Sequence, residues 1–224
     1  MPQAMRAEAP APLPAAIAAA LEEDIVFGRL HPRERLIEEE LAERFAASRH
    51  NVRAALAVLE GMGLIERIPH RGALVKAYSL AEVEQLCALR DLLETQAAQQ
   101  MPLPLPEAEL AVLRGLQAGH DAAVAAGDAR AAFRANLAFH RGFFARCGNA
   151  FLAEAIERLA QRAHAIRFAA FPDPAALARS REEHHAMLAA LASGDRAGLT
   201  RLCGNHLAPS RQAYLRAQSA FLSA

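Results

Sequence analysis

Residues 36–75, LIEEELAERFAASRHNVRAALAVLEGMGLIERIPHRGALV, hold the pattern that decides the fold of the N-terminal part of this chain. Apolar residues four apart predict a short helix over 37–45. Ser48 is a residue type that favours a helix N-cap, and the helix that it begins is expected over 48–60, before two glycines. The spacing therefore predicts two helices joined by a tight turn.

The residues on either side of these two helices complete the pattern. A further helix is expected over 13–27, where apolar residues recur every four positions. The runs 64–68 and 73–75 are short and rich in β-branched residues, with a four-residue turn between them, which predicts a β-hairpin. Three helices followed by a hairpin is the order of a winged helix-turn-helix, and no strand is expected elsewhere.

The rest of the chain is typical of an all-α bundle, so the fold class is mainly α. Ser79 and Glu82 form a capping box at the start of this region. Short connections between successive helices favour an antiparallel arrangement. The expected helices are 79–100, 106–126, 128–147, 150–170, 174–193 and 195–221. The expected organisation is a flexible tail (1–12), a winged helix-turn-helix domain (13–76) and a helical domain (79–221).

The composition excludes several classes of protein. Hydrophobic residues make up 53% of the 224 residues, so global disorder is not expected. The three cysteines are isolated, which argues against a disulfide framework and a cysteine zinc site. No apolar run reaches the roughly 18–20 residues that span a bilayer, so no membrane segment is expected and the cytoplasm is the expected location. The formal net charge is zero, so any DNA-binding argument must rest on local charge.

The helix that begins at Ser48 has the arrangement of a DNA-recognition helix. Arg49 and Arg53 are four apart and share one face, while His50 lies beside them at the N-terminal end. Residues 47–76 carry five cations and two acids, so positive charge gathers on this helix and the hairpin. The alternative is that the two arginines only solvate a surface helix.

The tip of the hairpin offers a second contact with DNA. His70 and Arg71 could reach phosphate or the minor groove, and Gly72 would permit close approach.

These motifs resemble the DNA-binding domain of GntR-type regulators over residues 13–76. The first departure from the family pattern is His50-Asn51 in place of Thr-Pro at the expected DNA surface, so no operator sequence can be carried over. The second is Pro32-Arg33 in place of Pro-Gly. The matching pieces are Leu41-Ala42, Ser48-Arg49, Val52-Arg53-Ala54-Ala55-Leu56, Leu59-Glu60, Gly63-Leu64 and Arg71-Gly72-Ala73-Leu74-Val75. The resemblance implies that Ser48, Arg49, His50, Arg53 and Gly72 contact double-stranded DNA, and Arg71 is added to these expected contacts by its place at the hairpin tip.

Three histidines in the helical region stand in contexts that suit a metal site. Asn136 and His140 are four apart and share one helix face. His184 and His185 are adjacent and point about 100° apart on a helix, so both are not expected to be ligands. His206 is expected on the last helix. Spacing alone leaves open that these are surface or core histidines.

Residues 79–216 resemble the FCD ligand-binding domain that often follows a GntR-type head. In metal-binding members an Asp or Asn and three histidines hold the ion, which implies Asn136, His140, His184 and His206 as ligands for Zn²⁺ or Ni²⁺. Asn stands here where Asp is common, and its neutral amide is a weaker donor. The resemblance implies a small organic acid as effector. The matching pieces are Leu89-Arg90-Asp91-Leu92-Leu93-Glu94, Phe139-His140, Gly148-Asn149, Glu183-His184, Met187-Leu188, Gly194-Asp195 and His206-Leu207.

Arg90 is a second candidate for holding the acid, because its guanidinium suits a carboxylate. The alternative is an ion pair with Glu94, four residues on.

Together these features predict a sequence-specific DNA-binding regulator, most simply a repressor, that binds a palindromic operator as a homodimer. The organic acid would shift operator affinity by binding two arrangements of the protein unequally. One rival is a metal-dependent enzyme on the bundle, for which Glu182 and Glu183 are the only nearby acids. A second rival is an architectural protein that binds DNA without sequence preference, which the zero net charge disfavours.

Overall fold

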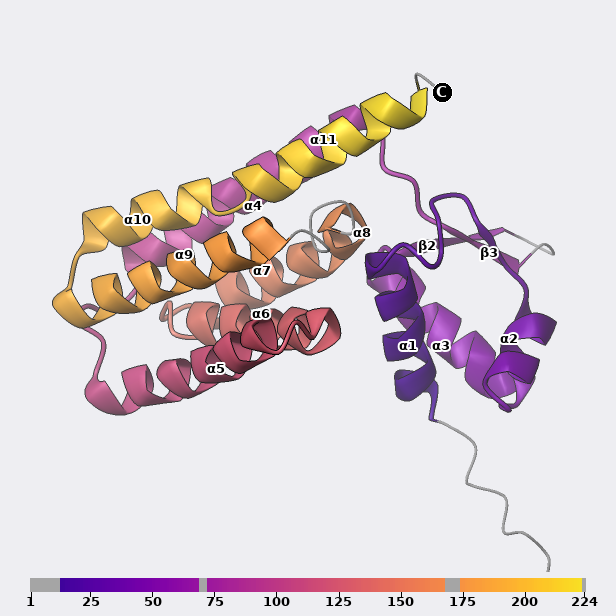
Figure 1. The fold of residues 1–224 in the computed structure, drawn as a ribbon, viewed down its shortest axis with the longest axis horizontal. Helices are drawn as coiled ribbons and strands as arrows, with labels where there is room; N and C mark the ends of the chain where they lie inside the picture. The colour runs from indigo at the N-terminus through magenta and orange to yellow at the C-terminus, as the bar shows by residue number, and fades with distance from the viewer. Residues whose placement is uncertain (1–12, 69–71, 168–173, 223–224) are drawn as a thin grey trace, which may run out of the picture. The chain divides into compact units, whose positions relative to one another are not determined.

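The computed structural model describes most of the chain as two compact units, and each unit is considered by itself (Figure 1). The N-terminal unit contains residues up to 25 and residues 29–77, and the C-terminal unit contains 26–28 and the residues from 78. The residues described are 13–68, 72–167 and 174–222. The expected tail at 1–12 and the hairpin tip with His70 and Arg71 lie outside them.

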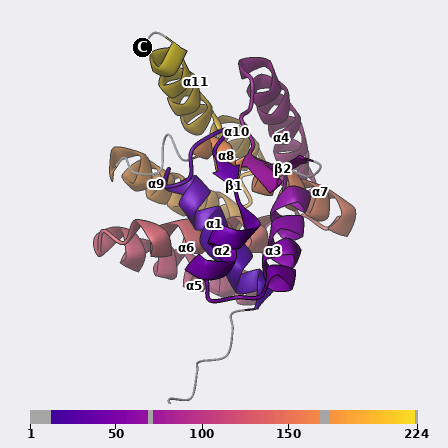
Figure 2. The ribbon, with the colours of Figure 1, turned by 90° about the vertical axis from the view of Figure 1, so that its right-hand side faces the viewer.

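The described part of the N-terminal unit has three helices and a three-stranded antiparallel sheet in the order β1-β3-β2. The second helix and the third meet at a turn in which Ala46 has a φ of 47°. In Figure 2 α3 is seen beside α2 and β2, against which it packs. The elements are α1 (Pro14–Val26), β1 (Arg35–Leu36), α2 (Glu38–Arg44), α3 (Arg49–Gly61), β2 (Ile65–Ile68) and β3 (Gly72–Val75).

The winged helix-turn-helix expected from the sequence is confirmed, with one addition. The hairpin pairs Ile65 with Val75, as the β-branched runs predict. The expectation of no other strand was wrong. β3 pairs with β2 on one side and with β1 on the other, where Leu36 lies opposite Ala73. A two-residue strand is too short to show a period of two, and only its partner in space defines it.

Arg33 shows the physical meaning of one departure from the GntR pattern. Its φ is 69°, in the left-handed region that favours glycine. Its backbone N–H donates to the oxygen of Val75 at 2.8 Å, which ties this turn to the end of β3. The arginine therefore occupies a position where glycine would avoid backbone strain.

The C-terminal unit is a helical bundle, as expected, with a capping box of Ser79 and Glu82 at its start. In Figure 1 α10 and α11 follow one another beside α4, against which both pack. α5 packs against α6 and α9, and α4 also packs against α7. The helices are α4 (Leu80–Gln100), α5 (Glu107–Ala125), α6 (Ala129–Phe144), α7 (Ala150–Arg162), α8 (His164–Arg167), α9 (Pro174–Ser193), α10 (Arg196–Asn205) and α11 (Ala208–Leu222).

Two of the predicted helices in this unit are broken. The helix expected over 150–170 divides at Ala163 into α7 and α8, and the helix expected over 195–221 divides at 206–207 into α10 and α11. The break at Ala163 has no proline or glycine beside it, so no local signal marks it. The break at 206–207 lies between Gly204 and Pro209, a signal that the prediction of one helix over 195–221 did not use. His206 had been expected within the last helix. It lies instead at the C-cap of α10.

The three cysteines are buried and form no disulfide, as their spacing predicts. Burial raises the pKa of Cys203 to about 12, which keeps it a neutral thiol. None of the described helices is both long and apolar enough to cross a membrane.

Candidate DNA-binding surface and metal centre

The N-terminus of α3 is fixed by its cap and its apolar face. The Ser48 hydroxyl accepts a hydrogen bond from the backbone N–H of Asn51 at 3.2 Å, so the predicted N-cap is confirmed. Val52, Leu56 and Leu59 are buried against the rest of the unit. The opposite face, which begins at residue 49, is therefore left to the solvent.

Two arginines project from this exposed face, and each pairs with an acid of α2. Arg53 Nε lies 2.7 Å from Glu38 Oε2, and Arg49 Nη1 lies 3.2 Å from Glu39 Oε1. The side chains of Arg49 and Arg53 are 62% and 61% exposed. His50 is exposed too. Ion pairs made by arginines as exposed as these contribute about 0–1 kcal/mol to stability. They can therefore break when DNA phosphates compete for the arginines.

The wing adds another cation to this surface. Arg67 of β2 donates from Nη2 to the backbone oxygen of Arg53 at 2.7 Å, and its Nε lies 3.3 Å from Glu60 Oε2. A hollow of about 510 Å³ lies between α2, α3 and the wing, with Arg35, Arg53 and Arg67 among its lining residues. The structure thus brings together three arginines of β1, α3 and β2, of which Arg35 and Arg67 had not been singled out from the sequence.

Gly72 has a structural reason to be glycine. Its φ is +85°, and a Cβ there would lie 2.7 Å from the backbone oxygen of Leu36 in β1. The close approach is therefore to a neighbouring strand, whereas the sequence had suggested close approach to DNA.

In the C-terminal unit His140, His184 and His206 converge on one point. His140 Nε2 lies 3.1 Å from His184 Nε2 and 3.0 Å from His206 Nε2. Nitrogens that share one ion at metal–nitrogen distances of about 2.0–2.1 Å lie roughly 3–3.4 Å apart. Both of these separations match that range, and all three ligand atoms lie within 4.8 Å of one another, so the residues present fit a divalent metal ion of the Zn²⁺ or Ni²⁺ type.

Hydrogen bonds on the far side of two rings set the direction of their lone pairs. Gln117 Nε2 donates to Asp121 Oδ1 at 2.8 Å, which orients the amide. Gln117 Oε1 then accepts from Nδ1 of His184 at 2.8 Å. The carboxylate of Glu183 accepts from Nδ1 of His206, with 2.5 Å between the atoms. Nε2 of both histidines is thereby left with its lone pair toward the shared point, the arrangement that orients metal ligands.

Asn136 lies next to this cluster. It is buried, and its Oδ1 accepts a hydrogen bond from the hydroxyl of Ser180 at 3.4 Å. The same hydroxyl is 3.5 Å from Nε2 of His184. The structure therefore places the expected fourth ligand near the histidines, on α6, one turn before His140.

The neighbouring histidines have other partners. His185 is exposed, and its Nε2 lies 3.0 Å from Asp121 Oδ2. His120 is wholly buried, with Nδ1 3.4 Å from Gln117 Nε2, and burial lowers its pKa. Neither belongs to the converging group.

A cavity of about 210 Å³ adjoins the cluster, and His140 lines it. Leu137, Phe144 and Ile156 provide apolar walls. Arg90 also lines the cavity, while its Nη2 lies 2.6 Å from Glu94 Oε1, with both side chains buried. The ion pair that the sequence offered as the alternative for Arg90 is thus present, and the same guanidinium borders a space that a small acid could fill.

The sequence gave no reason to single out Gln117, Asp121 or Ser180. Gln117 and Asp121 are four apart on α5, which indicates a common face but no partner. Ser180 is 44 positions from Asn136 along the chain. Their roles follow from helix packing, which a single sequence does not reveal.

Comparison with known proteins identifies both parts of the chain. The FCD domain matches residues 85–209, which is more than half of the 224 residues, and the family described as bacterial regulatory proteins, gntR family, matches residues 13–75. The HTH-type transcriptional repressor RspR of Escherichia coli (strain K12) is 34% identical over 89 residues, 40% of this chain and 39% of that protein. The HTH-type transcriptional regulator BphR of Paraburkholderia xenovorans (strain LB400) is 39% identical over 83 residues, 37% of this chain and 34% of that protein. The matches thus span little more than a third of these relatives.

Solved structures are similar over nearly the whole chain. McbR/YncC of E. coli has a TM-score of 0.73 and 25% identity, with 94% of this chain and 99% of that chain covered. A GntR transcriptional regulator from Rhodococcus sp. RHA1 has a TM-score of 0.73 at 19% identity, with coverage of 91% and 98%, and this likeness concerns the fold alone. The chain therefore belongs to the gntR family of bacterial regulatory proteins, with an FCD domain as its C-terminal part.

Proposed function

We propose that this protein is a sequence-specific DNA-binding transcription repressor whose operator affinity is controlled by a small organic acid, bound with a divalent metal in the FCD domain. The observation that carries the proposal is the exposed pair of arginines, Arg49 and Arg53, at the start of α3 in a winged helix-turn-helix. Arginine can bind guanine O6 and N7 with two hydrogen bonds, or hold phosphate. Ser48, His50, Arg71 and Gly72 are the further DNA contacts that we propose.

A homodimer on a palindromic operator is part of this proposal. One recognition helix contacts few bases, and proteins of this kind bind two half-sites about one DNA turn apart. α4 offers a face for pairing two copies, since Leu89 and Leu92 are 44% and 65% exposed. Gln85, Ala88 and Gln96 extend the same face without charge.

The metal is proposed at His140, His184 and His206, with Asn136 beside them. The convergence of the histidines supports this assignment, since they form a group within 4.8 Å. A bound ion would supply a positive centre for the carboxylate of the effector. Zn²⁺ and Ni²⁺ are among the ions that imidazole ligands suit.

The effector is proposed to occupy the cavity beside His140. Its volume of about 210 Å³ restricts it to a small molecule. Its walls combine apolar side chains with the cations of Arg90 and Arg141 and the acids Glu154 and Glu157, of which Glu157 is paired with Arg141. A short acid with an apolar part matches this lining. Its carboxylate would accept hydrogen bonds from Arg90, which would then share its guanidinium between Glu94 and the effector.

Repression has one support, the name of the E. coli relative RspR, which is called a repressor. A cytoplasmic location follows from the proposed role, because a regulator must reach the chromosome. The enzyme alternative lacks support, since the family and the named relatives are transcription regulators. Glu183, a possible base in that alternative, is engaged with His206.

The proposal is tested by selecting bound sequences from a random duplex pool with the full-length protein. We expect enrichment of a motif with two-fold symmetry, and a shift in its affinity when metal and a matching acid are added. Retention of DNA without any enriched sequence would support the architectural rival and contradict the proposal.

A further inference from the structure

The ligand set of the candidate metal centre contains no anion. Among the described histidine, cysteine, aspartate and glutamate side chains, the group that could hold an ion consists of His140, His184 and His206 alone. The adjoining Asn136 offers a neutral amide oxygen. These ligands would neutralise none of the double positive charge of a divalent ion held there.

Two acids are linked to the cluster by hydrogen bonds on the outer side of the rings. Glu183 contacts Nδ1 of His206, and Asp121 reaches His184 only through Gln117. They orient the ligands from the outer side, and among the described residues no carboxylate belongs to the group of atoms that could hold the ion. One side of the cluster is apolar, since the ring of Phe139 stacks on His184 with centroids 4.1 Å apart.

An unneutralised divalent charge in a largely buried site is costly, because the protein interior replaces hydration poorly. The cavity beside His140 is the place where a neutralising anion can enter: Arg90 and Arg141 line it together with Glu154 and Glu157, and Glu157 is paired with Arg141. An anion there gains from the ion, and the ion gains equally from the anion, because coupling between two ligands is reciprocal.

We infer that metal and carboxylate bind this protein interdependently, and that Asn136 sets this dependence by leaving the site without a fixed negative charge. The inference rests on the metal and acid binding of the proposed function. It identifies the effector as the missing anionic partner of the metal. An aspartate at 136 would supply that charge permanently and make the ion independent of the acid.

The experiment is calorimetric titration of Zn²⁺ into metal-free, full-length protein, with and without acetate, propionate or lactate at matched ionic strength. For the wild type we expect at least one of these acids to tighten the zinc Kd by about 5- to 150-fold. Asn136→Asp is expected to bind zinc tightly without acid and to show less than about a threefold response to the acid. Asn136→Ala serves as the matched control, since it removes the amide without adding charge and should keep the response. Circular dichroism checks that each variant is folded.

The outcomes separate this inference from the proposed function. Wild-type protein that binds zinc with the same Kd in every acid would overturn the interdependence and leave the metal site standing. A response to acid that is as large in Asn136→Asp as in the wild type would overturn the role of Asn136. No zinc binding by the wild type under any condition would overturn both the inference and the proposed metal site.

Discussion

Arg53 Nε of α3 lies 2.7 Å from Glu38 Oε2 of α2, so a side chain proposed to read DNA is held by an acid of the neighbouring helix. Arg49 and Glu39 repeat the relationship at 3.2 Å. All four residues belong to the same two helices of the winged helix-turn-helix. The positive charge of the surface is thus partly neutralised before DNA arrives, which suits selective binding better than general affinity for phosphate.

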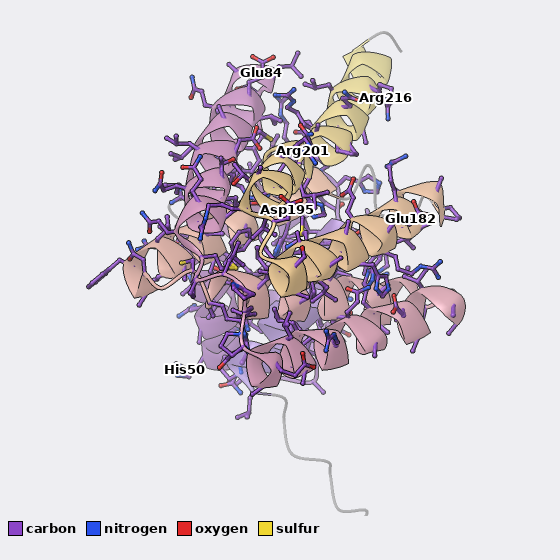
Figure 3. The ribbon with its side chains drawn as sticks, turned by 90° about the vertical axis from the view of Figure 1, so that its left-hand side faces the viewer. His50, Glu84, Glu182, Asp195, Arg201 and Arg216 are labelled. Carbon is purple, nitrogen blue, oxygen red and sulfur yellow. The ribbon has the colours of Figure 1, made fainter. Side chains whose placement is uncertain are left out.

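Replacement of Arg53 or Arg49 by alanine should weaken operator binding. A good arginine–base contact is worth about 1–3 kcal/mol, which corresponds to a loss of roughly 5- to 150-fold in affinity. Fluorescence anisotropy with labelled operator measures it. Arg201→Ala is the control, because Arg201 is an exposed arginine of α10, in the other unit (Figure 3). Unchanged operator affinity in both α3 variants would remove these arginines from the proposed contacts.

Glu38→Gln should raise affinity for DNA without an operator more than affinity for the operator. The substitution removes a negative charge beside Arg53 and keeps the shape of the side chain. We expect non-operator DNA to bind about 3- to 10-fold more tightly at low salt and the gain to shrink as salt screens the charge. Glu84→Gln, at an exposed position of α4 (Figure 3), is the charge-matched control. Equal gains in Glu38→Gln and Glu84→Gln would argue against a local effect.

Gly72→Ala should destabilise the winged domain. The added Cβ would approach the Leu36 oxygen to 2.7 Å at a φ of +85°, so strand and backbone must both adjust. The expected loss is about 1–3 kcal/mol in the free energy of unfolding, measured by urea denaturation. Gly61→Ala is the control, since a Cβ at Gly61 meets nothing within 4 Å. If the two variants unfold alike, the conformation assigned to Gly72 is not required.

His184→Ala should reduce metal bound per chain, whereas His185→Ala should not. The two residues are adjacent, but His184 joins the converging group while His185 is exposed and pairs with Asp121. Plasma mass spectrometry of protein dialysed against Zn²⁺ gives the content, and circular dichroism establishes that both variants are folded. Equal metal content in the two variants would reject the three-histidine assignment.

Stability should fall at high pH because of Cys203. Burial raises its pKa to about 12, so the folded protein keeps the proton while the unfolded chain releases it near pH 9. The stabilisation is complete below pH 9 and is lost as pH rises toward 12, by at most about 1.4 kcal/mol per pH unit. Urea denaturation between pH 8 and pH 11 should give a shallower decline for Cys203→Ala than for the wild type. Parallel declines would mean that this thiol does not contribute.

The sequence by itself determined the winged helix-turn-helix, because its signals are local: helical spacing, the Ser48 cap and a pair of β-branched runs around a turn. It also determined the helical character of the rest of the chain, and it singled out the three histidines through resemblance to the FCD domain. These properties depend on residues close together in the chain, where spacing fixes geometry.

Tertiary structure alone decided which side chains meet. β1 exists only because β3 lies beside it, and the arginines of α3 are paired only because α2 presents Glu38 and Glu39. Gln117 and His184 are 67 positions apart, yet their hydrogen bond helps to direct the lone pairs of the metal centre. The physical reason is that contacts between distant segments depend on how helices pack, and one sequence contains no spacing rule for that packing.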